Sequence, residues 1–333
     1  MTTPPPGTPI STQTPTPEAE GATGGRLHGR LSVLGLVISV LALAGVVWWA
    51  LRQDPPRLPS SAGEIGALLG AIGLYALNTL VRSERWHRLL LDDGARPARA
   101  DSYALTTIGY AVNNVLPARA GDAVRVVLLA PRADASKRSV AGTILAERLL
   151  DVGVILVLFL VVGYAVLGEV GGSVEWIALA TVVVVAGAVV AVLLVRRNER
   201  IHDAVAPVLS STLRLYSSHG VLLVGMTFAV WAIESAAWIA VGAAVGFSMS
   251  ALEGVYLVAL ASVFALIPSG PGYAGTQDAA TIIGIKAIGG TGATAVSYLV
   301  MLRFALTVPI TLVGFGLLAA RYGGLRRLRA ARA

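Results

Sequence analysis

The feature that most limits how this chain can fold is the length of its apolar runs, several of which continue for about 20 residues. A helix of that length spans the hydrocarbon core of a bilayer, whereas elements of soluble domains rarely contain such runs. The composition agrees, because 55% of the residues are hydrophobic and only 14% are charged, against roughly 25% charged residues in a soluble domain. These patterns predict an all-α polytopic membrane protein.

The apolar runs predict about six transmembrane helices. They lie at Val33–Leu51, Ile65–Val81, within Gly142–Leu167, and at Trp176–Val195, Val221–Val245 and Ala293–Ala320, which Pro309 interrupts. The segment Arg82–Arg88 follows the second run and combines basic residues with Trp86. That combination is typical of a membrane interface, so we expect this span to end at Val81.

Two further apolar stretches, Tyr103–Leu129 and Leu252–Ile288, are broken near their middles by proline and glycine. The first half of one, Tyr103–Leu116, would reach about 21 Å as a helix, less than the roughly 30 Å of the bilayer core. Broken backbone at membrane depth is tolerated where protein or a watery cavity surrounds it. We therefore predict two re-entrant hairpins, with breaks at Pro117, Gly121, Pro268, Gly270, Pro271, Gly272 and Gly275.

The basic residues favour one orientation in the membrane. With the N-terminus inside and both hairpins re-entrant, the basic clusters at 82–99, 132–138, 196–214 and after 320 all face the cytosol. Each half then holds three crossings and one hairpin, and the second half is inverted. We expect a disordered cytosolic tail (1–28), two membrane repeats (29–168 and 169–320) and a basic cytosolic tail (321–333). The protein is then a multi-pass protein of the cell membrane with both termini in the cytosol.

The hairpin tips support this inverted repeat. Leu116-Pro117 and Ile267-Pro268 are each followed by a glycine, Gly121 and Gly272, at the same spacing. Segments broken by proline and glycine in matching positions of two inverted halves are typical of the central site of a transporter. The alternative is a chance match in a chain that contains 37 glycines.

Composition also excludes several classes of site. The chain has no cysteine and only four scattered histidines, so thiolate chemistry is excluded and no metal site is expected. It contains no Walker A motif, which disfavours direct coupling to ATP, and we expect no cofactor. The net charge of +7 follows from the membrane topology, so we expect no nucleic-acid partner.

Three motifs in order resemble one known family. They are NVLPARAGDAVR at 114–125, ERLLD at 147–151 and IPSGPGYAG at 267–275, and the Arg85-Trp86 pair is similar to the same pattern. Over roughly residues 30 to 320, the chain resembles the lysylphosphatidylglycerol synthase transmembrane region family of flippase-like proteins. The resemblance implies a lipid-handling membrane domain, whose relatives are associated with aminoacylated phospholipids and polyprenyl-linked sugars. Because only a short basic tail follows Ala320, we expect no aminoacyl transferase domain.

The first hairpin carries the residues best suited to an anionic headgroup. Arg119 and Arg125 flank the break, and guanidinium groups bind phosphate through charge-assisted hydrogen bonds. The alternative is that they extend to the cytosolic headgroups of the bilayer. Asn113 and Asn114 line the same cavity or cap the broken helix.

Polar residues in the second hairpin and in the long helices complete the candidate site. After the glycine-rich turn come Tyr273, Thr276, Gln277 and Asp278, which either bind a ligand or satisfy the loop's own backbone. The long helices contain Glu147, Arg148, Asp151, Glu234 and Arg303. Ionisable residues at bilayer depth are costly and usually face a cavity, although Glu234 with Arg303 is equally consistent with a structural ion pair.

These observations leave three functional hypotheses. The first is a flippase that moves an anionic lipid or lipid-linked headgroup, passively or coupled to an ion gradient through Glu147, Asp151 or Glu234. The second is a membrane transferase that uses a polyprenyl-phosphate donor, with Asp122 or Glu147 as base. The third is an accessory subunit that anchors a separate lipid or glycan synthase. A homo-oligomer is compatible with all three, and we expect the first, with no catalytic residues.

Overall fold

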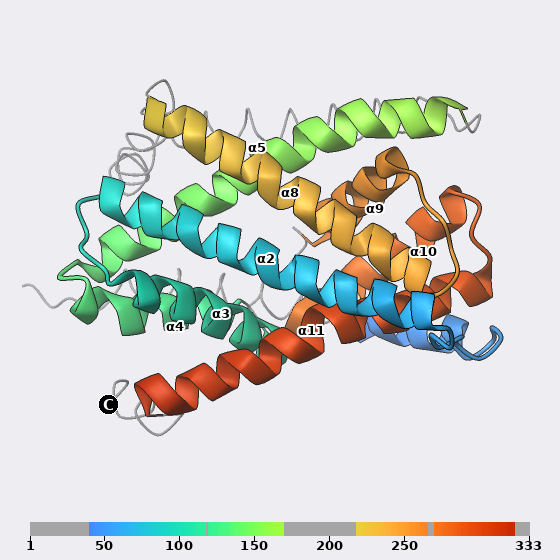
Figure 1. The fold of residues 1–333 in the computed structure, drawn as a ribbon, viewed down its shortest axis with the longest axis horizontal. Helices are drawn as coiled ribbons and strands as arrows, with labels where there is room; N and C mark the ends of the chain where they lie inside the picture. The colour runs from blue at the N-terminus through green and yellow to red at the C-terminus, as the bar shows by residue number, and fades with distance from the viewer. Residues whose placement is uncertain (1–39, 118, 170–217, 266–269, 324–333) are drawn as a thin grey trace, which may run out of the picture.

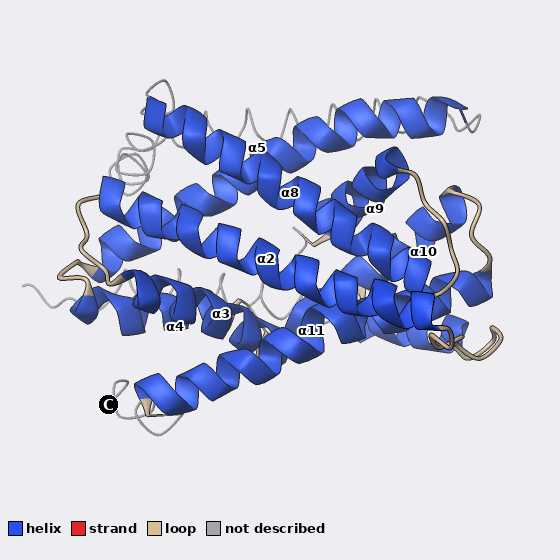
Figure 2. Cartoon of the chain, in the orientation of Figure 1, coloured by secondary structure: helices blue, strands red, loops and turns tan. Residues whose placement is uncertain are grey.

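All the regular structure in the described part of the chain is helical. The computed structural model describes residues 40–117, 119–169, 218–265 and 270–323, and no strand occurs within these ranges (Figure 2). The main helices are α2 (Ala62–Asp92), α3 (Arg99–Val115), α4 (Ala120–Leu129), α5 (Lys137–Glu169), α8 (Ser218–Ala244), α9 (Ala251–Phe264), α10 (Thr276–Ala287) and α11 (Gly292–Tyr322). Shorter helical segments are Val40–Ala50, η1 (Ala130–Arg132) and η3 (Pro271–Tyr273). The predicted span Trp176–Val195 and the tip residue Pro268 lie outside the described residues.

The helices are long and apolar enough for a membrane. Three of them, Ala62–Asp92, Gly220–Ala244 and Gly292–Tyr322, meet the length and hydropathy of a spanning helix. Large apolar side chains also cover the outward faces, as Leu312 on α11 shows by being 70% exposed. Such faces are stable in contact with lipid, so the predicted all-α membrane fold is confirmed.

Two of the helices begin at the same kind of signal. The Ser61 side chain accepts a hydrogen bond from the Glu64 N–H, and the Glu64 carboxylate accepts one from the Ser61 N–H. Ser250 and Glu253 repeat this arrangement at the start of α9. Each capping box satisfies backbone donors that the first helical turn leaves unpaired, so these boundaries follow directly from the sequence.

Two expected helix boundaries are corrected. Helix α2 does not end at Val81 but continues to Asp92, and Arg82, Arg85 and Trp86 are buried in the protein. These residues are therefore not an interfacial anchor. Helix α11 likewise runs without interruption through Pro309, because the helices around it support a backbone that lacks one hydrogen bond.

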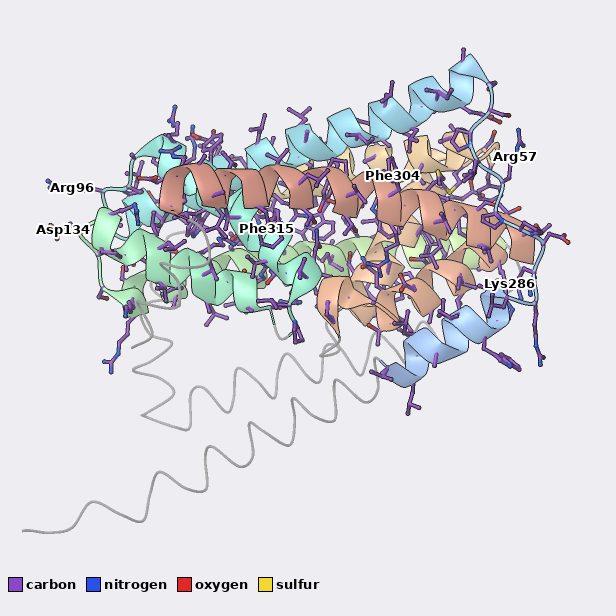
Figure 3. All side chains as sticks on the ribbon, turned by 90° about the horizontal axis from the view of Figure 1, so that it is seen from below. Arg57, Arg96, Asp134, Lys286, Phe304 and Phe315 are labelled. Atoms are coloured by element: carbon purple, nitrogen blue, oxygen red, sulfur yellow. The ribbon has the colours of Figure 1, made fainter. Side chains whose placement is uncertain are left out.

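The helices form two hairpins that meet at a central pair. Helices α2 and α8 pack side by side in the middle of the bundle (Figure 1). Helix α3 packs on α4 and on α11, while α9 packs on α10 and on α5. The base of the first hairpin, marked by Arg96 and Asp134, lies at one end of the bundle, and Lys286 marks the base of the second at the opposite end (Figure 3). The two hairpin tips therefore approach each other in the middle.

Close packing at the first tip depends on glycine. A Cβ atom on Gly121 would lie 1.9 Å from the Gly109 carbonyl oxygen, so α3 and α4 approach this closely only because the side chain is absent. The Asn113 side-chain oxygen accepts a hydrogen bond of 2.7 Å from the Gly121 N–H. It thereby caps the first turn of α4, which was one of the two roles expected for the tip asparagines.

Candidate functional site

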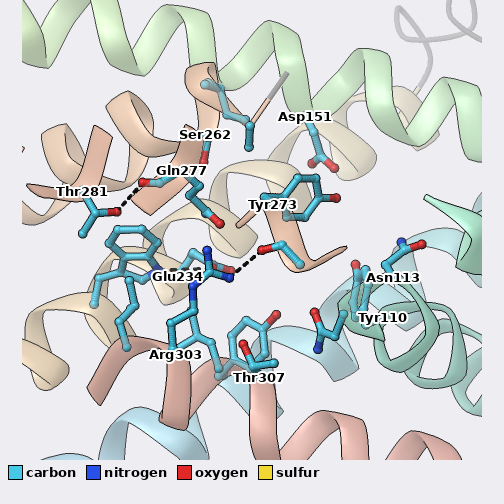
Figure 4. Close-up of a pocket in the computed structure, with 18 of the residues that line it drawn as sticks. Tyr110, Asn113, Asp151, Glu234, Ser262, Tyr273, Gln277, Thr281, Arg303 and Thr307 are labelled. Carbon is cyan, nitrogen blue, oxygen red and sulfur yellow. Dashed lines mark hydrogen bonds between the residues drawn. The ribbon is translucent and has the colours of Figure 1, made fainter. Parts of the chain in front are cut away.

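A cavity of about 200 Å³ lies where the two hairpin tips meet. Side chains from both hairpins and from α2, α5, α8 and α11 line it (Figure 4). Its charged residues are Arg82, Arg119, Arg148, Asp151, Glu234, Asp278 and Arg303. Buried charges require compensation, so we follow the partner of each.

A buried ion-pair cluster adjoins the cavity, which its member Asp151 lines. The Glu147 carboxylate accepts hydrogen bonds from Arg125, at 2.9 Å, and from Arg85, at 3.3 Å. Arg85 also donates to both oxygens of Asp151, at 2.7 and 3.0 Å. The Arg125 guanidinium stacks on the Trp86 ring, 3.9 Å from its centroid. Glu147, Arg85 and Arg125 are 0% exposed, so this cluster holds α2, α4 and α5 together.

The carboxylate of α8 pairs with α2 rather than with α11. Glu234 accepts hydrogen bonds from the Asn78 amide and from Trp238 Nε1, and Arg82 lies 3.5 Å away. The expected ion pair between Glu234 and Arg303 is not formed. An apolar helix sequence gives the depth of a charge but not the neighbour that the bundle places beside it.

Two further ion pairs connect the hairpins to the long helices. Asp122 on α4 accepts from Arg148 on α5, at 3.3 Å. Asp278 on α10 accepts from Arg303 on α11, which also donates to the Gly272 carbonyl oxygen. The partner of Arg148 is therefore Asp122, which α4 brings to it, and not a carboxylate of α5 itself.

Arg119 differs from the other cavity arginines. It lies at the tip of the first hairpin, where its backbone has a φ of 53°. Its guanidinium stacks over the Tyr273 ring at 5.4 Å and donates to the Ala265 carbonyl oxygen at 3.4 Å. Within the described ranges it forms no ion pair with a carboxylate. The cavity thus presents a cation whose charge is not neutralised by the surrounding described residues.

Several donors around the cavity also lack partners. Among the described residues, the buried Tyr110 hydroxyl, the Asn113 amide nitrogen, Arg148 Nε and Trp231 Nε1 have none. All four residues line the cavity. An unsatisfied buried donor costs about 1–3 kcal/mol, so these four groups lower the stability of the arrangement around the cavity. The described part of the chain contains no group of three or more potential metal ligands.

The cavity contains most of the residues that the sequence singled out. Those that line it are Asn113, Asn114, Arg119, Arg148, Asp151, Glu234, Gly272, Tyr273, Gln277, Asp278 and Arg303. Asp122, Arg125, Glu147 and Thr276 do not line it. Sequence reasoning missed Tyr75, Arg82, Tyr110, Trp231 and Trp238 as lining residues. The spacing of Asn78, Arg82 and Arg85 on one helical face was a usable signal.

Comparison with known proteins agrees with this architecture. No curated protein matches the chain. The family model described as the lysylphosphatidylglycerol synthase TM region matches residues 32–314, which include both hairpins and all of the cavity. The chain therefore belongs to the lysylphosphatidylglycerol synthase transmembrane region family, a lipid-related family of membrane proteins.

Proposed function

We propose that this protein is a flippase that binds an anionic lipid or lipid-linked headgroup in the central cavity and moves it across the membrane. The observation that carries the proposal is Arg119, the cavity arginine without a carboxylate partner in the described structure. A partly buried cation is costly until an anion neutralises it, and guanidinium groups bind phosphate oxygens strongly. An anionic headgroup would supply that charge.

The unpaired donors favour the same ligand chemistry. Tyr110, Asn113 and Trp231 each offer a hydrogen, from a hydroxyl, an amide and an indole nitrogen. These buried atoms meet a ligand only when the surrounding side chains move, and a ligand that then satisfies them must present several acceptor oxygens together with its negative charge. A phosphodiester meets both requirements, and its acyl or prenyl chains would remain in the lipid beside the bundle.

The helix packing supports an inverted repeat as the route of transport. If α2, α3, α4 and α5 correspond to α8, α9, α10 and α11 in that order, the contact of α3 with α11 corresponds to the contact of α9 with α5. The contact of α2 with α8 then corresponds to itself. The two hairpins also enter from opposite ends (Figure 3). Alternating access around a fixed central site is how such repeats move a substrate.

The charge distribution supports the orientation. The end that contains the base of the first hairpin is rich in basic residues, among them Arg96, Arg99, Arg132, Lys137 and Arg138. By the positive-inside tendency this end is cytosolic. Both termini are then cytosolic, as the sequence predicts, and we place the protein in the cell membrane.

The geometry gives less support to a transferase. Its expected base is Asp122 or Glu147, and neither residue lines the cavity. Glu147 is fully buried between Arg85 and Arg125, so a substrate in the cavity cannot reach it. These positions favour binding and movement of a headgroup over chemistry on it.

Translocation by the purified full chain tests the proposal. Reconstituted vesicles carry fluorescent phosphatidylglycerol, and an impermeant quencher reports its movement between leaflets. We expect the Arg119→Ala variant to reduce the rate on the order of tenfold, the equivalent of about 1.4 kcal/mol. Arg132→Ala is the matched control, because Arg132 also stacks on a tyrosine, Tyr322, and donates to a backbone carbonyl, but lies outside the cavity. Equal rates in the two variants would refute the role of Arg119.

A further inference from the structure

The two hairpin tips share a backbone conformation that defines their equivalence. Pro117-Ala-Arg119-Ala-Gly121 and Pro271-Gly-Tyr273-Ala-Gly275 have proline, alanine and glycine at the same spacing. Arg119 and Tyr273 occupy the third position, have φ angles of 53° and 58°, and stack on each other. Left-handed backbone is uncommon for residues other than glycine, so its recurrence here supports this register.

Beyond each tip, the next helix presents the same ion pair. Asp122 is the third residue of α4, three positions after Arg119, and Asp278 is the third residue of α10, five positions after Tyr273. Asp122 pairs with Arg148 on α5, 26 residues later, and Asp278 pairs with Arg303 on α11, 25 residues later. Each pair therefore ties the inner end of one hairpin to the long helix that follows it.

The two pairs are unequal. Arg148 approaches Asp122 through Nη2 alone, at 3.3 and 3.4 Å, while its Nε lacks a partner in the described structure. Arg303 uses both Nε and Nη2 on Asp278, and Asp278 also accepts from the Gly275 N–H at 3.0 Å. The Asp122 side chain is 19% exposed and that of Asp278 only 6%. The first pair is thus the looser one.

We propose that Asp122–Arg148 and Asp278–Arg303, each in the first turn after a hairpin tip, are latches that close the cavity toward opposite ends of the bundle. Release of the first lets α4 leave α5 and opens the cavity toward the end marked by Arg96. Release of the second lets α10 leave α11 and opens it toward the end marked by Lys286 (Figure 3). Both arginines line the cavity, so an incoming anion replaces the carboxylate on either of them. The inference rests on the alternating access of the proposed function.

A cysteine reporter in the cavity tests the latches without any lipid substrate. Ser262 lines the cavity (Figure 4), and the native chain has no cysteine, so Ser262→Cys labels without background. An impermeant thiol reagent is applied to membrane vesicles of each orientation. In Asp122→Asn we expect labelling from the Arg96 end to rise, on the order of fivefold, relative to labelling from the Lys286 end. In Asp278→Asn we expect the opposite shift.

Arginine variants keep the test decisive if an asparagine variant folds poorly. Arg148→Gln and Arg303→Gln break the same two pairs from the other side, so each should shift the labelling ratio in the same direction as the asparagine variant of its own pair. Shifts in the same direction in both asparagine variants, or no shift in either, would show that the pairs are structural only. That result would leave anion binding at Arg119 untouched, because no lipid ligand enters the measurement.

Discussion

The arginines of the buried ion-pair cluster and the arginine at the tip of the first hairpin differ in how their charges are compensated. Arg85 forms ion pairs with Glu147 and Asp151, Arg125 forms one with Glu147, and both arginines are fully buried. Arg119 has a carbonyl oxygen and a tyrosine ring for neighbours, and no carboxylate within the described ranges. The difference teaches that, in the described part of the chain, carboxylates neutralise the arginines that hold the helices together but not the arginine at the hairpin tip. Arginines of the first kind should determine stability, and Arg119 should determine binding.

The largest effect on stability is expected at the fully buried cluster. Glu147→Gln leaves Arg125 with only a 3.6 Å approach to Asp122, and an uncompensated buried charge costs roughly 3–5 kcal/mol of unfolding free energy. Thermal unfolding in detergent measures the loss. The control is Glu84→Gln, whose partners Arg88 and Arg99 are more exposed and whose loss should cost less than about 1 kcal/mol. Equal losses of unfolding free energy in Glu147→Gln and Glu84→Gln would contradict a special contribution of the buried cluster to stability.

A smaller effect is expected at the edge of the cavity. Glu234→Gln weakens contacts to Asn78 and Arg82, and charged hydrogen bonds contribute about 2 kcal/mol. The pairing is checked by a double-mutant cycle. Glu234→Gln should couple to Arg82→Met, and it should be additive with Arg303→Met within about 0.5 kcal/mol. Coupling to Arg303 instead would restore the pairing expected from the sequence.

Much of the architecture was predictable because a membrane imposes strong rules on sequence. Breaks at Pro117 and Gly121 could only be tolerated inside a protein or a cavity, and this placed Arg119 at a hairpin tip. The end of α2 was missed because the membrane rule places it where the apolar run stops, at Val81, while the helix continues to Asp92. Polar residues after that point looked interfacial, although helical spacing brings them onto a buried face.

The ion-pair partners were beyond the reach of local patterns. Arg85 meets Glu147 across 62 residues, and Asn78 meets Glu234 across 156. These pairings exist only once the long helices α2, α5 and α8 have packed together. The register of the proposed repeats was ambiguous too, because both Pro268 and Pro271 are followed by glycine four residues later. The left-handed backbone of Arg119 and Tyr273 favours Pro271 as the equivalent of Pro117.

The smallest effect on stability, and the most direct test of the central claim, lies at Arg119. Without ligand, Arg119→Ala should change the unfolding free energy by less than about 1 kcal/mol, because no ion pair is broken. Added short-chain phosphatidylglycerol should raise the Tm of the wild type and of Arg132→Ala by more than phosphatidylcholine does. At 100 times the dissociation constant this stabilisation is about 2.7 kcal/mol.

The decisive measurement is therefore the difference in Tm between phosphatidylglycerol and phosphatidylcholine for wild type, Arg119→Lys and Arg119→Ala. We expect a clear difference for the wild type, a smaller one for Arg119→Lys, which keeps the charge but loses the planar fork, and none for Arg119→Ala. An undiminished difference in Arg119→Ala would contradict the assignment of this arginine to an anionic headgroup.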